Sequence, residues 1–256
     1  MKVYIMTDME GVAGVLSADD YTDQASRYYE AGRELTTLEV SAAVQGCLDE
    51  GATEVLVVDG HGSGAIALRL LHPAATLLAG RPLGYPFGCD ETFVAAMMVG
   101  QHAKSNTDGG HLSHTGSFAV DELTINGVSV GEMGCNMLFC AHFGVPVVLV
   151  TGDEAAAAEA HALVPEIETV AVKSGVRWGP ASPPSRTSCT TAGQCICTPT
   201  GRERRSGTRR PGPWPATARS PRTGWSRRTS WSRCCAPPPR LRPAPRGSRP
   251  RTSSSC

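Results

Sequence analysis

Short apolar runs recur along the first 180 residues and are rich in the aliphatic residues typical of buried strands. Glycine, proline or polar residues bound each run, which suits strands buried on both faces of a sheet. Residues 120–130 differ, because Asn-Gly at 126–127 is the residue pair of a type I′ turn and predicts a hairpin. The runs predicted to be strands are 3–7, 54–58, 77–78, 93–99, 145–150 and 169–172.

Longer segments with apolar residues at helical spacing separate these strands. Residues 34–50 carry one apolar face and are followed by Gly51, a residue that commonly ends helices. Further helices are expected at 131–143 and from a cap at Asp153 to about Leu163. Because strands alternate with helices, we predict an α/β fold in three layers: a mainly parallel sheet with helices on both faces.

Residues capable of binding a metal follow three of the predicted strands. Asp8 and Glu10 follow the first, His61 follows the second, and His102 follows the fourth. Residues i and i+2 of an extended chain point to the same side, so both carboxylates are expected to enter one crevice. Parallel strands share a carboxyl edge, where open α/β sheets bind their ligands. Gly11 is expected to let the chain turn away there.

Two other segments add candidates. Glu132 lies in the first turn of the predicted helix, and a Gly- and Ser-rich loop at 105–117 holds His111 and His114. Each residue alone has a simpler explanation: Asp8 as a helix cap, His61 as a loop histidine, Glu132 as an acid favoured by the helix dipole. Histidines away from strand ends are expected to be structural, namely His72, His142 and His161.

Convergence of four segments on one sheet edge favours a metal site over these separate explanations. Three carboxylates and two imidazoles suit two zinc ions that share one carboxylate. The expected ligands are Asp8, Glu10, His61, His102 and Glu132.

Composition changes abruptly near residue 179. Residues 1–180 carry 8 Lys and Arg against 23 Asp and Glu, whereas residues 181–256 carry 16 against 1, with 13 prolines and six cysteines. We therefore predict a catalytic domain at 1–178 and a disordered basic tail at 179–256. Such a tail can bind nucleic acid. The hypothesis we prefer is a frameshift, because abundant Arg, Pro, Ser and Cys are typical of a GC-rich gene read out of frame.

The first residues and the cysteines favour a cytoplasmic protein. Five residues between Lys2 and Asp8 are too few for a signal peptide, and no apolar run approaches the roughly 20 residues of a membrane span. The cysteines of the first part have no zinc-knuckle or disulfide spacing and are expected to be reduced. They are Cys47, Cys89, Cys135 and Cys140.

Five short motifs occur in order along residues 1 to about 178. They are Met6-Thr7-Asp8-Met9-Glu10-Gly11, Asp59-Gly60-His61, Gly100-Gln101-His102-Ala103, Ser113-His114 and Gly131-Glu132-Met133-Gly134. Together they resemble the DppA-type D-aminopeptidases, the M55 family of zinc peptidases. The resemblance implies a dinuclear zinc hydrolase that removes N-terminal D-amino acids from short peptides and assembles as a ring-shaped homodecamer.

The resemblance also implies a role for each residue. Asp8 would bridge two zinc ions, with Glu10 and His61 completing one site. His102 and Glu132 would complete the other. His114 would be the catalytic residue, described in the family as a nucleophile, whereas proton transfer is the alternative that amide chemistry favours. The loop is one residue longer than the family pattern, which leaves His111 as a competitor.

Two other functions are compatible with the same residues. A carboxylate and imidazole set also serves amidases and phosphoesterases that use two metals. A non-catalytic chain is the other alternative, because residues 181–256 do not match the family's carboxyl-terminal lobe. Nucleotide chemistry is disfavoured, since the sequence has no P-loop or Rossmann glycine fingerprint.

Overall fold

A computed structural model describes residues 1–176 and 193–195 of the chain. Its main sheet has the strand order β3-β2-β1-β4-β7-β8-β9, with every neighbouring pair parallel except β8 and β9. The strands are β1 (Lys2–Thr7), β2 (Glu54–Asp59), β3 (Ala75–Leu78), β4 (Ala95–Gln101), β7 (Val147–Asp153), β8 (Glu168–Val176) and β9 (Gly193–Cys195).

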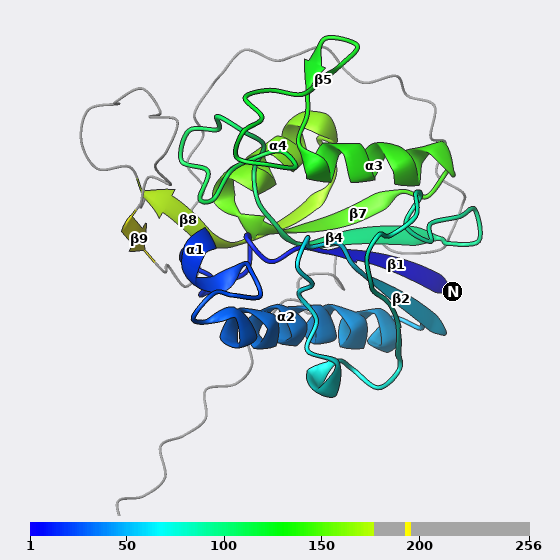
Figure 1. The fold of residues 1–256 in the computed structure, drawn as a ribbon. Helices are drawn as coiled ribbons and strands as arrows, with labels where there is room; N and C mark the ends of the chain where they lie inside the picture. The colour runs from blue at the N-terminus through cyan, green and yellow to red at the C-terminus, as the bar shows by residue number, and fades with distance from the viewer. Residues whose placement is uncertain (177–192, 196–256) are drawn as a thin grey trace, which may run out of the picture.

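Helices cover both faces of this sheet, which confirms the predicted three-layer α/β fold (Figure 1). Helix α2 (Tyr29–Asp49) lies on one face, and α3 (Glu132–His142) and α4 (Glu154–Leu163) lie on the other. Alternate residues of β1 serve the two layers. Val3 and Ile5 pack with α2, whereas Tyr4 and Met6 pack in the cluster that includes α3 and α4. Both faces of β1 are therefore buried, as its continuous apolar run requires.

Most predicted elements are present with shifted ends. Strand β4 runs to Gln101 rather than 99, and β7 runs to Asp153 rather than 150. Helix α2 begins at Tyr29, five residues before the predicted start. The strands extend because backbone pairing with neighbours continues past the apolar residues. Asp153 then caps α4 as predicted, its carboxylate accepting from the Ala156 amide at 2.7 Å.

Three smaller features complete the described part. The predicted hairpin is confirmed as β5 (Thr124–Ile125) and β6 (Val128–Ser129), with φ of 52° at Asn126 and 80° at Gly127. A helical turn α1 (Ala18–Tyr21) and the 3₁₀ turn η1 (Leu68–Leu70) were not expected from the sequence pattern. Both are too short to show helical periodicity.

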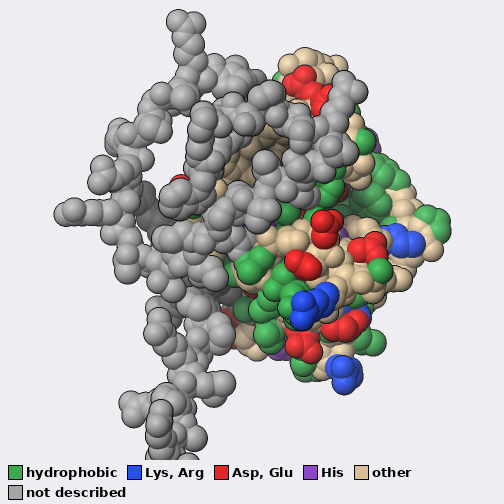
Figure 2. Space-filling model, turned by 60° about the vertical axis from the view of Figure 1, so that its left-hand side comes forward, with side chains coloured by type: hydrophobic (Ala, Val, Ile, Leu, Met, Phe, Trp, Pro, Cys, Tyr) green, Lys and Arg blue, Asp and Glu red, His purple; other side chains and the backbone are tan. Residues whose placement is uncertain are grey.

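Most of the predicted disordered tail, 179–256, lies outside the described residues. Gly193–Cys195 depart from that prediction, because they pair antiparallel with the edge of β8. Backbone pairing of this kind needs no apolar pattern in the sequence. On the face drawn in Figure 2, acidic side chains of the described part are interspersed with basic and apolar ones. Among the described residues, no helix combines the length and apolarity that a bilayer crossing requires.

Two glycines pack against Gln101, the last residue of β4, which directly precedes His102. A Cβ atom at Gly11 or at Gly152 would lie 1.9 Å from the carbonyl oxygen of Gln101. The chain turns at Gly11 as predicted, and close backbone packing is a further reason why a side chain is excluded there. The backbone around Gln101 is thus fixed between the segment after β1 and strand β7.

Replacing Gly152 with alanine is expected to force β4 and β7 apart. Overpacking of a closed core typically costs about 1–3 kcal/mol, so Gly152→Ala should lower the free energy of unfolding in urea by at least that amount. Gly84→Ala is the control, because a Cβ at Gly84 meets no atom within 4 Å. Equal stability of the two variants would contradict this expectation, because it would show that the backbone around Gln101 can shift to accommodate the added methyl group.

Candidate metal centre

Asp8 and Glu10 lie directly after β1 and are buried, with 9% and 4% of their surfaces exposed. The Asp8 amide donates to the Val99 carbonyl at 2.8 Å, so pairing between β1 and β4 continues up to the first carboxylate. Asp8 Oδ1 lies 3.3 Å and Glu10 Oε2 lies 3.1 Å from Nδ1 of His61. The two carboxylates therefore enter one crevice, as their i, i+2 spacing predicts.

The His61 ring is oriented by the nitrogen that faces away from the carboxylates. Nε2 of His61 lies 2.7 Å from the Thr22 carbonyl oxygen and must donate a hydrogen bond to it. In the neutral ring Nδ1 then carries a lone pair, directed toward Asp8 and Glu10. The turn itself is held by Asp59, whose carboxylate accepts from the amides of Ala65 and Ile66.

His102 and Glu132 form a second group beside the first. His102 follows β4, and its Nδ1 lies 2.9 Å from the Ala103 carbonyl, which leaves Nε2 with the lone pair. That Nε2 lies 3.3 Å from Asp8 Oδ2 and 3.7 Å from Glu132 Oε1. Glu132 is the first residue of α3, and its Oε1 accepts from the Gly116 amide at 2.6 Å. The helix dipole alone therefore does not explain Glu132, because its carboxylate also contacts groups of the centre.

His114 lies against this second group. Its ring stacks on His102 with centroids 4.0 Å apart and an interplanar angle of 11°, and the Phe118 ring lies 4.5 Å from its centroid. Nδ1 lies 2.9 Å from the Leu112 carbonyl, and Nε2 lies 3.5 Å from Glu132 Oε1. The free lone pair of His114 thus points into the centre, where it can bind a metal or move a proton.

His111, the competitor of His114, is placed elsewhere. It is buried, and its Nε2 lies 3.1 Å from the Leu16 carbonyl. Burial and the nearby Lys173 ammonium lower the pKa of His111 to about 4. Neither His111 nor the three histidines expected to be structural belongs to a group of converging donor atoms among the described residues; those three are His72, His142 and His161.

One carboxylate joins the two groups. Asp8 presents Oδ1 to His61 and Oδ2 to His102, at 3.3 Å in each case. Within each group the donor atoms lie within 4.8 Å of one another. The first group is Asp8, Glu10 and His61, and the second is His102, His114 and Glu132.

Electrostatics show that this arrangement requires positive charge. Burial, and then the Glu10 charge, raise the pKa of Asp8. Burial also disfavours the charged forms of Glu10 and His61, but close contacts outweigh it: His61 lowers the pKa of Glu10 below its usual range, and Asp8 and Glu10 raise that of His61 to about 11. In His102, burial is outweighed by the charges of Asp8, Glu10 and Glu132, so its pKa also rises.

The donor atoms fit a divalent cation. Glu10 Oε2 is buried and accepts no hydrogen bond from the described residues, although it faces Nδ1 of His61 at 3.1 Å. With Nε2 committed to Thr22, Nδ1 must either bind a proton or share a cation with the carboxylate. Ligands about 2.0–2.1 Å from a tetrahedral zinc lie roughly 3.3 Å apart, close to these separations. Mixed imidazole and carboxylate donors suit zinc and related divalent metals.

Two basic residues that the sequence analysis did not select hold the segments that carry ligands. Arg81 donates to the carbonyls of Asp59 and Gly62, each at 3.1 Å, and to that of His61. Lys173 of β8 is 5% exposed and donates to the carbonyl of Glu10 and, at 2.9 Å, to that of Val15. Periodicity within β8 could have indicated that Lys173 points inward, but not what it contacts.

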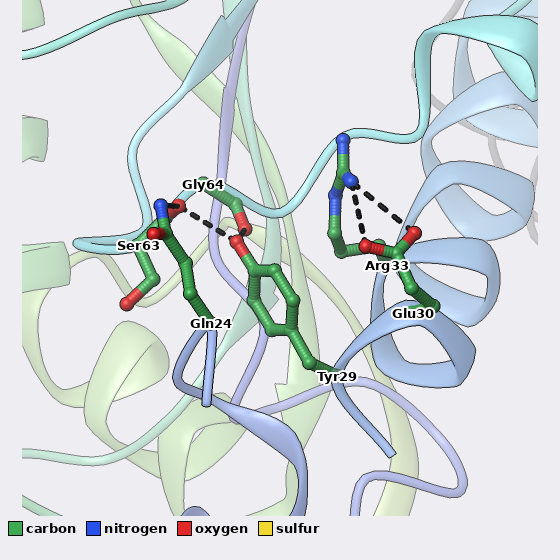
Figure 3. Close-up of a pocket in the computed structure, with 6 residues that line it drawn as sticks. All are labelled: Gln24, Tyr29, Glu30, Arg33, Ser63 and Gly64. Atoms are coloured by element: carbon green, nitrogen blue, oxygen red, sulfur yellow. Dashed lines mark hydrogen bonds and ion pairs between the residues drawn. The ribbon is translucent and has the colours of Figure 1, made fainter. Parts of the chain in front are cut away.

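A separate hollow of about 380 Å³ lies beside the turn that carries His61. Figure 3 shows Tyr29 pointing at this turn, with its hydroxyl 2.7 Å from the Ser63 carbonyl and 2.6 Å from that of Gly64. Arg33 pairs with Glu30 at 3.1 Å on the same wall. None of the six converging donor residues lines this hollow, so it is distinct from the centre.

A mainly parallel sheet with carboxylates and imidazoles gathered at its carboxyl edge is an arrangement found in α/β proteins that bind metals, a class that includes metal-dependent hydrolases. The family model described as D-aminopeptidase, peptidase M55, matches residues 1–194, and the chain belongs to this family.

Two relatives place the chain more closely. It is 39% identical over 179 residues to a curated D-aminopeptidase of Bacillus subtilis (strain 168), covering 69% of this chain and 65% of that protein. The solved structure of the Zn-dependent D-aminopeptidase DppA from Bacillus subtilis, described as a self-compartmentalizing protease, matches with a TM-score of 0.64 and 39% identity. That match covers 68% of this chain and 64% of the solved one, so the chain spans about two thirds of the length of these relatives.

Lys173 is expected to stabilise the loop between Glu10 and Val15. Lys173→Met removes two hydrogen bonds from a charged donor, and because burial of that charge opposes them we expect a net loss of about 1–3 kcal/mol in the free energy of unfolding. Arg69→Met is the control, since Arg69 is exposed. A loss no larger than the roughly 0.5 kcal/mol typical of surface substitutions would contradict this role.

Proposed function

We propose that the chain is a zinc-dependent aminopeptidase that hydrolyses N-terminal D-amino acids from short peptides. The observation that carries this proposal is the Asp8 carboxylate placed between two imidazoles, in a chain that belongs to the D-aminopeptidase family. The catalytic unit is residues 1–178. Because the chain spans about 65% of its curated relative, activity and substrate are inferences from the shared part.

Two zinc ions per chain are the cofactor in this proposal. Asp8 would be the ligand that they share, because its two oxygens face different imidazoles 3.3 Å away. Glu10 and His61 complete one site, and His102 and Glu132 complete the other. Five protein ligands are more than a single tetrahedral zinc accepts, and catalytic zinc sites keep a position open for water or substrate.

Zinc, when bound, supplies a Lewis acid that polarises a carbonyl and lowers the pKa of water to about 7. The protein orients the imidazole ligands. The Thr22 carbonyl fixes the His61 ring and the Ala103 carbonyl fixes the His102 ring, so each ring presents its lone pair to the centre. Burial of Asp8, Glu10 and His102 excludes bulk water and strengthens each electrostatic contact.

His114 is the catalytic residue in this proposal and transfers a proton. Its Nδ1–H is donated to the Leu112 carbonyl, which leaves Nε2 to accept a proton from the attacking water and to pass it to the amine released when the amide C–N bond breaks. Stacking between His102 and Phe118 holds the ring in this orientation. We prefer proton transfer by His114 to direct attack of its imidazole on the amide, because proton transfer requires no covalent intermediate on His114.

The partners in this proposal follow from the family. Substrates are short peptides with an N-terminal D-residue, and the chain acts in the cytoplasm as a homo-oligomer, in keeping with the self-compartmentalizing description of its solved relative. Neither a membrane nor nucleic acid is required. The preference for D-residues is inferred from membership of the D-aminopeptidase family.

Asp8→Ala is expected to lose more zinc than any other single substitution, because a bridging carboxylate serves both ions. Elemental analysis of the purified chain should give about two zinc ions for the unchanged protein and one or fewer for the variant. Glu34→Ala is a matched control on the exposed surface of α2. One tightly bound zinc that Asp8→Ala leaves in place would rule out the bridging role.

His114→Ala is expected to lower hydrolysis of a D-alanyl peptide by at least about 100-fold, the range of acid–base catalysis, while zinc content stays near two. His111→Ala should affect turnover much less, since its ring contacts Leu16 outside the centre. Loss of zinc in His114→Ala would instead make His114 a ligand. An L-alanyl peptide serves as the stereochemical control, and its equal hydrolysis by the unchanged protein would contradict the proposed substrate class.

A further inference from the structure

We propose that Glu159 is a positioning residue that fixes the distance between His102 and Glu132 and thereby the second metal position. This inference rests on the proposed function. Glu159 lies in the middle of α4, a helix with no metal ligand, and its side chain is buried. Its hydrogen bonds go to backbone amides and not to a donor atom of the centre, so its effect on ligand positions passes through the backbone, beside the direct attraction between its charge and His102.

Its two carboxylate oxygens hold two different segments. Oε2 accepts from the Lys104 amide at 2.8 Å, and Oε1 accepts from the Gly131 amide at 3.2 Å. Lys104 lies two residues after His102, and Gly131 immediately precedes Glu132. One side chain therefore connects the segment after β4 to the start of α3, and these segments carry the two proposed ligands of the second position.

The same two segments are in close contact around Glu159. A Cβ atom at Gly131 would lie 2.8 Å from Cβ of Lys104 and 3.2 Å from Oε1 of Glu159. The Lys104 ammonium also donates to the Ser129 carbonyl at 3.0 Å. Because the backbones are already this close, the two segments cannot move nearer to each other to compensate for a lost acceptor.

A carboxylate is the group that this position requires. Both neighbours are N–H donors, and an ionised carboxylate accepts at both oxygens. Glutamine has nearly the same shape but accepts at one atom only, so its amide nitrogen must face one of the two donors. Glu159→Gln therefore separates the segments without creating a cavity, which distinguishes positioning from packing.

The test is a zinc titration of the full chain against a competing chelator, for the unchanged protein, Glu159→Gln and Glu154→Gln. Glu154 is exposed on the same helix and is the matched control. We expect Glu159→Gln to bind one zinc normally and the other about 10- to 100-fold more weakly, as changes behind metal ligands do. The metal-free variant should unfold as a cooperative unit, and Co²⁺ substitution should show altered absorption from one site only.

Each outcome decides the proposal. Two zinc ions bound by Glu159→Gln with unchanged affinity would overturn it, as would equal weakening of both. If the unchanged chain binds fewer than two zinc ions, the dinuclear assignment itself is wrong. The titration of the unchanged chain therefore tests the proposed function separately from the role of Glu159. If Glu159→Gln does not fold, Gly131→Ala decides, because its Cβ presses on the same contact: selective weakening of one zinc supports the inference, and two normal sites refute it.

Discussion

The sharing of Asp8 between two imidazoles is the interaction on which the centre depends. Burying the charged Asp8 carboxylate beside the Glu10 carboxylate is unfavourable. The His61 and His102 rings, one on each side of Asp8, offset this cost. In the same way, contact with His61 lowers the pKa of Glu10, and contact with the carboxylates raises the pKa of His61. A cation between these donors relieves this cost directly, because it replaces the protons that the imidazoles would otherwise bind.

Parallel strands place the donors of this centre without a long connecting loop. Strands β1, β2 and β4 are neighbours in the sheet, and each delivers its ligand within three residues of its last paired residue. The close approach of Gly11 and Gly152 to the Gln101 carbonyl keeps the end of β4 fixed. The ligands therefore inherit the rigidity of the sheet, which is what a metal centre with separations near 3.3 Å requires.

Local sequence patterns predicted the residues whose donor atoms come together, because each stands at the end of a recognisable element. Asp8, Glu10, His61 and His102 follow apolar runs, and parallel pairing then brings those ends together. Lys173 and Glu159 were not predicted, because each acts on the backbone of a segment distant in sequence. Nothing in an alanine-rich helix or in a strand pattern indicates such a partner. The same limit applies to Gly11, where the sequence predicted the turn but not the close contact with the Gln101 backbone.

The centre is independent of the part in which the chain and its relatives differ in length. All six converging donor residues lie between Asp8 and Glu132, well inside the matched residues 1–194. The side chains that orient or brace them, including Lys173 and Glu159, also lie before residue 177. The residues proposed to bind metal therefore all lie in the part that the chain shares with its relatives.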